Sequence, residues 1–145
     1  MWKKRSKPKS RNEILRDRLD SVFSKYIRLK YAYSGGICQC VSCGALKDWK
    51  EIQNGHYMSR RYMSTRFDED NCRPQCVSCN MYNQGNIQMY RHRLVSQIGE
   101  HRVNRVEVRA RTEIRKYADF EYEELIKHYQ GEVKRLKEEK QIRQI

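Results

Sequence analysis

The first clear pattern along the chain is a run of apolar residues between Ser10 and Tyr33. Ser10 and Glu13 can form a capping box at its start, and the two glycines after Ser34 end the pattern. The sequence therefore predicts a helix from about residue 11 to about residue 33. The apolar residues recur every three or four positions, as on one face of a helix: Ile14, Leu15, Leu19, Val22, Phe23, Tyr26 and Ile27.

Two later stretches also predict helices. One runs from about Asn80 to Gly99, where the glycine ends the apolar pattern. The other follows Asp119, a suitable N-cap, and we expect its narrow apolar stripe to pack on the first helix or on a second copy of the chain. Residues 103–111 show no decisive pattern. The stripe of the last helix consists of Leu125, Tyr129, Val133 and Leu136.

Short strands are expected between these helices. Residues 49–52 and 57–58 contain aromatic and apolar side chains, and residues 54–55, Asn-Gly, are typical of a hairpin turn. His56 would then lie at or just after that turn, and a loop rich in Arg, Ser and Asp would follow. The middle of the chain therefore reads strand, strand, helix, and the predicted fold class is α+β.

The chain has 145 residues, enough for one domain, and its charge is unevenly distributed. Hydrophobic residues make up only 38% of it, so a bound metal ion would add much to a small core. Residues 1–11 hold six basic and no acidic side chains, which predicts a disordered basic arm before a domain over residues 12–118. Residues 119–145 form a charged helix with six basic and seven acidic side chains, so the net charge of +13 comes from the earlier residues.

This excess of positive charge indicates a polyanionic partner. Nucleic acid is the first candidate and an acidic membrane surface the second. No apolar run approaches the length of a membrane span or a signal-peptide core. We therefore expect a soluble protein that works on DNA in a reducing cytoplasm, with no membrane partner.

The cysteines are the strongest chemical signal. Two Cys-x-x-Cys pairs let four sulfurs reach one ion, so we predict a structural zinc site. The alternative is a set of disulfides, which would need an oxidising compartment and a further pair between Cys38 and Cys72. Cys38 could also replace Cys40 as a ligand, whereas Cys72 is expected to be a buried apolar residue. The pairs are separated by 32 residues and consist of Cys40 with Cys43 and Cys76 with Cys79.

His56 lies between the two cysteine pairs and can serve as a general base, since imidazole has an unperturbed pKa of about 6.5. The alternative is an ordinary surface or packing histidine. Asn71 could hydrogen-bond the backbone around the loop that carries His56 and fix the ring's direction, or it could simply cap a turn. Asn80 and Asn83 offer amide oxygens suited to magnesium, or either could cap the helix that follows.

His56, Asn71 and Asn80, with paired cysteines on both sides, resemble the HNH (ββα-metal) endonuclease motif. A longer string is similar to the bacteriophage NinG (Rap) recombination proteins, and this similarity extends from the first helix to about Leu136. The string comprises Gly55-His56-Tyr57, Arg66-Phe67, Asn71, Gln75-Cys76-Val77-Ser78-Cys79-Asn80, Gly85-Asn86, Tyr90-Arg91 and Ile98-Gly99.

The resemblance implies a zinc-stapled ββα-metal core flanked by an N-terminal helix and C-terminal helices. It also implies a structure-selective endonuclease that hydrolyses branched recombination intermediates, such as Holliday junctions and D-loops, in the cytoplasm of a phage-infected host. His56 would be the general base and Asn71 would orient the loop. Asn80, or Asn83 in its place, would lie beside a catalytic Mg²⁺ or Mn²⁺, and the two cysteine pairs would bind the structural Zn²⁺.

The sequence departs from the motif at Gly55. Many HNH enzymes have an Asp or His metal ligand immediately before the catalytic histidine, so here the cation lacks an anionic ligand. Asp68, Asp70 or the DNA phosphates could supply one. A zinc-binding DNA module without catalysis is therefore one alternative function. An HNH nuclease that cuts linear duplex, as restriction and homing enzymes do, is another.

Basic residues near these positions are candidate DNA contacts. Tyr57 and Tyr62 are interleaved among those that follow His56, a combination that suits phosphates beside a distorted strand. No segment resembles a base-reading helix, so we expect recognition of DNA shape rather than sequence. Symmetric cutting of a four-way junction would favour a homodimer, with the last helix as its interface. The candidate contacts are Lys3, Lys4, Arg5, Arg60, Arg61, Arg66, Arg91 and Arg93.

Overall fold

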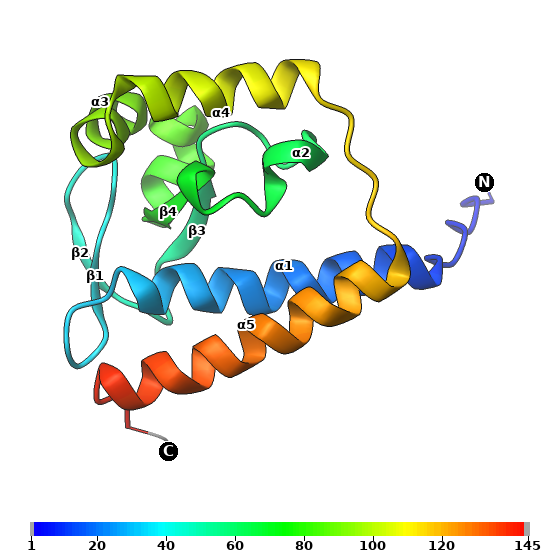
Figure 1. Ribbon diagram of the computed structural model, residues 1–145, viewed down its shortest axis with the longest axis horizontal. Coiled ribbons are helices and arrows are strands. Elements are labelled where there is room, and N and C mark those ends of the chain that lie inside the picture. Colours follow the sequence, from blue (N-terminus) through cyan, green and yellow to red (C-terminus); the bar gives the residue numbers. More distant parts are fainter. Residues whose placement is uncertain (1, 144–145) are drawn as a thin grey trace.

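The computed structural model describes residues 2–143 and has an α+β architecture (Figure 1), which confirms the predicted fold class. Helices α1 and α5 form one layer, and the strands lie between this layer and helices α3 and α4. The helices are α1 (Arg11–Lys30), α2 (Met63–Arg66), α3 (Ile87–Ile98), α4 (Glu100–Thr112) and α5 (Asp119–Glu139). The strands are β1 (Ile37–Gln39), β2 (Leu46–Asp48), β3 (Gln53–His56) and β4 (Cys72–Gln75).

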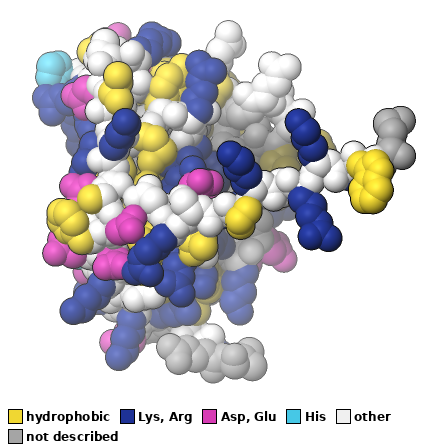
Figure 2. Space-filling model, turned by 90° about the vertical axis from the view of Figure 1, so that its right-hand side faces the viewer, with side chains coloured by type: hydrophobic (Ala, Val, Ile, Leu, Met, Phe, Trp, Pro, Cys, Tyr) yellow, Lys and Arg dark blue, Asp and Glu magenta, His cyan; other side chains and the backbone are white. Residues whose placement is uncertain are grey.

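Residues 2–10 carry no helix or strand, and all their side chains are exposed. They extend away from the body of the molecule, and Figure 2 shows Lys and Arg side chains along this extension and over the face beside it. Lys9 is tied back to α1 by an ion pair of 2.6 Å with Asp17. The expectation that this arm is disordered stays a prediction.

Helix α1 begins at Arg11 because Ser10 caps it. The Oγ atom of Ser10 accepts a hydrogen bond from the backbone N–H of Glu13 and donates one to its Oε1, both at 3.2 Å. The predicted Ser10 cap is confirmed, but the return bond of a capping box, from the Ser10 backbone N–H to the Glu13 side chain, is replaced by a bond between the two side chains. The helix ends at Lys30 rather than near Tyr33. Its buried face consists of Leu15, Leu19, Phe23, Tyr26, Ile27 and Leu29.

Helix α5 lies beside α1 and runs parallel to it (Figure 1). Near their N-terminal ends, Asn12 Nδ2 donates to the Tyr117 carbonyl at 2.9 Å and to Asp119 Oδ1 at 2.8 Å. Beyond their C-terminal ends, Lys140 Nζ donates to the Ala32 carbonyl at 2.7 Å. The two helices are therefore tied together at both ends.

The apolar stripe of α5 packs on the first helix, which confirms one of the two predicted arrangements. The stripe is therefore covered within the chain, and the homodimer expectation stays a prediction. The N-cap of α5 is Ala118 rather than Asp119, and its backbone N–H donates to Glu121 Oε2 at 2.8 Å, so the predicted cap is wrong by one residue. The stripe residues buried in the core are Tyr129, Val133 and Leu136, and Leu125 packs against them.

The strands differ from those predicted. β1 pairs antiparallel with β2, and β3 pairs antiparallel with β4, so that His56 lies opposite Cys72. Residues 49–52 form a turn and residues 57–58 follow the end of β3, so both predicted strands are wrong. Residues 54–55 lie inside β3 rather than in a turn, because this strand pairs with a segment much later in the chain. His56 is therefore the last residue of a strand.

The helix predicted from about residue 80 is divided. Ser78–Tyr82 form a π-helical turn and Gln84–Asn86 a 3₁₀ turn, so α3 starts only at Ile87. It ends at Gly99 as predicted, and this glycine has a φ of 85°, which favours glycine over other residues. The undecided stretch that follows forms α4.

The core consists of two clusters. The larger one joins α1 to α5 and the strands, and in it the Phe23 ring lies 5.0 Å from the Tyr129 ring and 5.8 Å from the Phe67 ring, measured between centroids. Across residues 2–143, no helix is both long and apolar enough to cross a membrane. The smaller cluster consists of Val41, Tyr57, Tyr90, Leu94 and Val103.

Truncation of the α1 core tests this packing. Leu19 has no exposed surface, so Leu19→Ala is expected to lower the free energy of unfolding by about 2 to 5 kcal/mol through lost burial and a residual cavity. Denaturant unfolding followed by circular dichroism measures the change. Leu46→Ala on β2 is the control, because Leu46 is 62% exposed and its loss is expected to cost less than about 0.5 kcal/mol. Equal effects of the two variants would contradict the packing.

Candidate functional site

The two Cys-x-x-Cys pairs come together in one cluster, and their four Sγ atoms all lie within 4.8 Å of one another. One pair lies in the turn between β1 and β2, and the other lies in the turn after β4. Two N–H donors point at the sulfurs: the backbone N–H of Cys76 lies 3.3 Å from Cys40 Sγ, and Asn86 Nδ2 lies 3.5 Å from Cys79 Sγ. Such donors favour thiolates, and four thiolates at this separation fit a tetrahedral zinc ion. The cluster could therefore hold a metal ion such as zinc.

The other two cysteines lie outside this cluster. Cys38 Sγ donates to the Arg28 carbonyl at 3.1 Å, and burial raises the pKa of this thiol to about 11. Cys72 is fully buried, which raises its pKa well above the usual value. All six cysteines, each within the described part of the chain, are free thiols. Cys38 therefore does not replace Cys40 in the cluster.

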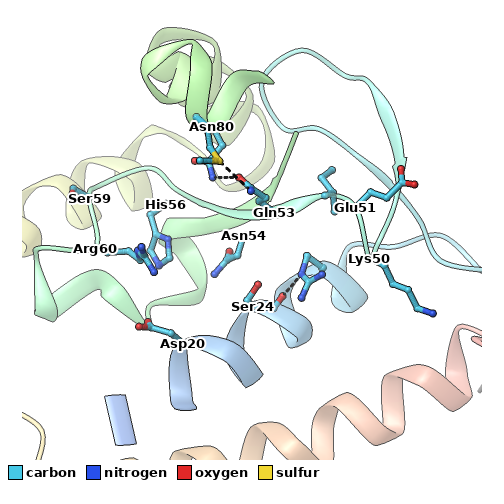
Figure 3. A pocket seen from close by; sticks show the side chains of 13 residues that line it. Asp20, Ser24, Lys50, Glu51, Gln53, Asn54, His56, Ser59, Arg60 and Asn80 are labelled. Carbon is cyan, nitrogen blue, oxygen red and sulfur yellow. Dashed lines mark hydrogen bonds between the residues drawn. The ribbon is translucent and has the colours of Figure 1, made fainter. Parts of the chain in front are cut away.

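A cleft of about 720 Å³ lies between α1 and β3 (Figure 3). Helix α1 supplies Asp20 and Ser24 to its lining, and β3 supplies Asn54 and His56. The helical turn after β4 supplies Asn80 from the opposite side. The fold thus brings together two of the three residues of the HNH-like pattern.

His56 is anchored through one ring nitrogen. Its Nε2 lies 2.9 Å from the carbonyl oxygen of Arg66. A carbonyl can only accept, so in the neutral imidazole Nε2 carries the proton and Nδ1 keeps its lone pair. Burial, together with a smaller effect of the nearby Arg60, lowers the pKa of His56 to about 4. The imidazole is therefore neutral near pH 7, as a general base must be.

Asn71 has no exposed surface and closes the loop that follows His56. Its Oδ1 accepts from the Met58 N–H at 2.7 Å, and its Nδ2 donates to the carbonyls of Met58 and Thr65, both at 3.0 Å. One side chain thus joins the two ends of the loop, and Thr65 directly precedes the residue whose carbonyl holds the imidazole. The structure places Asn71 behind the cleft, as a support for its wall.

The two candidate magnesium residues lie in different places. Asn80 lines the cleft, and its Nδ2 donates to Gln53 Oε1 at 2.8 Å, which leaves its Oδ1 as the group available to a cation. Asn83 is exposed and lies outside the cleft lining. Of the two, Asn80 is the one that shares the cleft with His56.

Gly55 is required by the packing around it. A Cβ at this position would lie 2.3 Å from Oε1 and 2.6 Å from Cβ of Gln75. Gln75 is itself held in place, because its Nε2 donates to Ser42 Oγ at 2.9 Å and to the Gly85 carbonyl at 2.5 Å. Gln75 therefore occupies the space that an Asp or His metal ligand at position 55 would need.

Asp68 and Asp70 lie outside the cleft lining. Asp68 Oδ2 forms an ion pair with Arg109 at 2.8 Å, and Asp70 Oδ2 accepts from Arg102 Nε at 3.1 Å. Both arginines lie on α4, so these carboxylates hold that helix against the loop. The expectation that either of them completes a cation site beside His56 is not supported by their placement.

The candidate DNA-contacting residues have different environments. Arg60 is exposed and lines the cleft. The guanidinium of Arg61 lies 4.8 Å from the ring centroid of Tyr62. Arg91 is paired with a glutamate of α4 at 2.8 Å, whereas Arg93 is exposed on α3. The basic residues of the N-terminal arm are exposed as well.

Arg66 differs from the other candidate DNA contacts in being largely buried. Its side chain is 11% exposed, and its guanidinium forms an ion pair with Asp20 on α1. A side chain held in this way has little surface to offer a DNA phosphate. Its placement does not favour the predicted DNA contact of Arg66, which stays a prediction.

Several residues that line the cleft could not be predicted as site residues from the sequence. Three of the missed residues recur every four positions and so lie on one face of α1. Another is two positions before His56 and therefore shares its face of β3. These spacings are visible in the sequence, but no local pattern indicates that α1 faces β3. The missed residues include Asp20, Ser24, Arg28, Lys50, Glu51, Gln53, Asn54, Ser59 and Met81.

Comparison with known proteins extends this picture. Residues 1–139 match the family described as bacteriophage lambda NinG protein. The chain belongs to the NinG family. The proteins named ninG from Escherichia phage 933W, Escherichia phage lambda and Salmonella phage P22 are each 39% identical to it over 69 residues. This stretch is 47% of the chain and 33 to 34% of each relative, so the chain spans about a third of their length. No solved structure matches the chain.

The NinG family match includes every part of the site. It covers the four clustered cysteines, the residues that line the cleft and the whole of α5. The geometry described above is therefore that of the NinG-like part of the chain. The family name itself does not specify a catalytic activity.

Zinc content tests the cysteine cluster. We expect about one zinc ion per chain, and Cys43→Ser is expected to remove most of it because one of the four ligands is lost. Metal analysis by inductively coupled plasma mass spectrometry measures the content. Cys38→Ala is the matched control, because it removes a buried thiol outside the cluster and should leave zinc in place. Full zinc content in both variants would contradict the predicted ligand set.

The titration of His56 tests its environment. Its pKa is expected near 4, against about 6.5 for a free imidazole. Between these values the unfolded chain binds more protons, so the stability contributed by neutral His56 is lost as the pH falls from about 6.5 toward about 4. NMR titration of the ring gives the midpoint directly, and His56→Gln should remove part of the stability loss. A midpoint near 6.5 would contradict the burial of the ring.

Proposed function

We propose that this chain is a metal-dependent DNA endonuclease of the HNH (ββα-metal) type that acts on branched recombination intermediates such as Holliday junctions and D-loops. The observation that carries the proposal is the state of His56. It lines a cleft, its Nε2 is bound to a carbonyl, and its Nδ1 is the nitrogen that can accept a proton. A histidine that acts as a general base must be neutral, with one ring nitrogen held in place and the other available to take a proton, and His56 has this arrangement.

Hydrolysis of a phosphodiester requires a base that removes a proton from the attacking water. In the proposed reaction His56 Nδ1 takes this proton while the water oxygen attacks phosphorus. The bond between phosphorus and the leaving sugar oxygen then breaks, and that oxygen takes up a proton from solvent water. The resulting imidazolium is stabilised by the Arg66 carbonyl, whose negative end faces Nε2 at 2.9 Å. Asn71 keeps the loop, and so this carbonyl, in place through its bonds to Met58 and Thr65.

Asn80 would hold Mg²⁺ or Mn²⁺ through its Oδ1. A cation bound there would neutralise charge on the phosphate and on the leaving oxygen. The cleft offers further oxygens from Ser24 and Asn54, and magnesium commonly takes part of its coordination from substrate phosphates. Since Gly55 contributes no carboxylate, cation binding should depend strongly on bound DNA.

The order of elements supports the HNH type. Strand β3 ends at His56, the loop held by Asn71 follows, and β4 then leads into the helical turn that carries Asn80. One cysteine pair precedes β3, and the other lies between β4 and Asn80. Strand, strand and helix therefore follow one another in the order that the ββα-metal motif requires.

Three features support branched DNA as the substrate. The NinG (Rap) resemblance points to recombination intermediates, which occur in the cytoplasm of an infected bacterium. Lys50 and Arg60 line the cleft and suit phosphate contacts. Met81 also lines the cleft, and the neighbouring Tyr82 is 81% exposed, so an apolar surface is available for bases that are unstacked at a branch. A homodimer would place two such clefts on a symmetric junction.

A zinc-binding DNA module without catalysis is the second candidate function. Gly55 and the Gln75 side chain that fills the space beside it favour this reading, because they leave the expected metal-ligand position without a carboxylate. Such a module would bind branched DNA through the same basic residues, and added magnesium would act only by screening charge.

Cleavage of labelled four-way junction, forked and linear duplex DNA tests the proposal. With Mg²⁺ or Mn²⁺ the chain should cut branched substrates, and EDTA should stop it. His56→Ala is expected to reduce cleavage by about 100-fold or more because the base is lost, while DNA binding and zinc content stay unchanged. His92→Ala, which removes an exposed histidine on α3, should behave as wild type. Binding without cleavage under all conditions would favour the silent module, and equal cutting of linear duplex would refute branch selectivity.

The cation site is tested in the same assay by a matched pair of variants. Asn80→Ala should raise the Mg²⁺ concentration needed for half-maximal cleavage, because it removes the amide oxygen in the cleft. Asn83→Ala should leave that concentration unchanged, because Asn83 lies outside the cleft. The opposite pattern would place the cation beside Asn83.

A further inference from the structure

Helix α1 is connected to the proposed base through one arginine. The Asp20 carboxylate binds the Arg66 guanidinium with both oxygens: Arg66 Nε lies 2.9 Å from Oδ1, and Nη2 contacts Oδ2. The two side chains are only 17% and 11% exposed. A fork-shaped pair of this kind, largely shielded from water, fixes direction as well as distance. It therefore sets where Arg66 lies relative to α1.

Arg66 in turn holds the loop around His56. Its carbonyl binds His56 Nε2 at 2.9 Å, and its Nη1 donates to the Arg60 carbonyl at 3.1 Å. Arg66 is the last residue of α2, which has only four residues and is too short to keep its own geometry. The direction of its carbonyl thus depends on contacts from outside α2, and the ion pair with α1 is the strongest of these.

We propose that Asp20 is a positioning residue for His56: it fixes Arg66, and the Arg66 carbonyl keeps the imidazole in the Nε2–H form with Nδ1 free. The role of Nδ1 in hydrolysis rests on the proposed function. The positioning of the His56 ring by Asp20 does not rest on the proposed function, because it is a property of the folded chain alone.

The rival role for Asp20 is that of a ligand to the catalytic cation, since it lines the same cleft. Both of its oxygens are engaged by Arg66, so a cation would have to displace a guanidinium and leave it buried without a partner. Figure 3 also shows Asp20 on the opposite side of the cleft from Asn80. The geometry therefore favours positioning over coordination.

The charges that face His56 predict how its titration responds. Besides burial, which lowers the pKa of His56, Arg60 and Arg66 lower it and Asp20 raises it. Loss of the Asp20 charge would leave two cations facing the ring, so the pKa should fall further. The pH below which cleavage is lost should then move down, which a loss of stability would not produce.

The first test observes the ring nitrogens of the full chain by NMR at neutral pH. In wild type, His56 should be in the Nε2–H form, and Asp20→Asn should introduce a measurable share of the Nδ1–H form. Asp17→Asn is the matched control: Asp17 lies one turn earlier on α1, is paired with Lys9 and Arg16 at the surface, and should leave His56 unchanged. An unaltered His56 tautomer in folded Asp20→Asn would overturn the proposal.

Cleavage kinetics provide the second test. Asp20→Asn should lower kcat by about 10- to 100-fold, as the loss of residues that orient metal-ligating side chains does in other proteins. The Mg²⁺ concentration for half-maximal rate should stay unchanged. The acid limb of the pH profile should move to lower pH. A raised Mg²⁺ requirement together with a normal His56 tautomer would overturn the proposal and assign Asp20 to the cation.

A second variant keeps the proposal testable if Asp20→Asn does not fold. Arg66→Lys retains a positive charge beside Asp20 but loses the two parallel hydrogen bonds of the guanidinium. It should therefore also introduce a measurable share of the Nδ1–H form of His56. Circular dichroism and zinc content identify folded protein in each case. If wild type cuts no DNA, the proposed function fails, and the NMR result still decides whether Asp20 positions the ring.

Discussion

The antiparallel pairing of β3 with β4 is the constraint on which the rest of the site depends. It places His56 opposite the first residue of β4, and because Asn71 directly precedes that strand, the same pairing puts its amide inside the loop after His56. At the other end of the ladder, Gln53 faces Gln75, and the chain then enters the second cysteine turn. A slip of one residue would turn His56 to the other face of the sheet and separate it from the cleft.

The sequence was informative where a signal is local and misleading where it is not. The cysteine pairs, the Ser10 cap and the stop at Gly99 each depend on residues a few positions apart, and all of them could be predicted. Strand β3 reads Gln-Asn-Gly-His, residue types with little preference for strands, and its partner lies beyond a long loop. The pairing depends on burial against α1, which no local pattern records. Asp20 was missed for the same reason, since its importance comes from the helix packing that brings it to Arg66.

The cleft around the neutral His56 is lined by both neutral and charged side chains, among them the carboxylates of Asp20 and Glu51 and the basic groups of Arg28, Lys50 and Arg60. Gly55 stands where a carboxylate would be expected, and Asn80 presents an amide. Asp20 is engaged by an arginine of the loop and Asp68 by an arginine of α4, and Figure 3 shows the Glu51 carboxylate pointing away from His56. Negative charge that the chemistry requires would thus arrive with the DNA itself. Under the proposed function, the site would then bind divalent cations more tightly once the polyanion is present.

The parallel pairing of α1 with α5 has a consequence for how the molecule is made. Residues 119–139 cover the apolar face of residues 11–30, so that face stays open during synthesis until nearly the whole described chain has emerged from the ribosome. The cysteine turns and α3 are contributed by residues in between and can form earlier, from contacts closer in sequence. Although α5 supplies no residue to the cleft, it covers α1, which is one wall of the cleft, so that wall would reach its final support last. Unfinished chains would carry the histidine and the cysteine cluster without a finished wall, and the order of synthesis alone would keep them from acting on DNA.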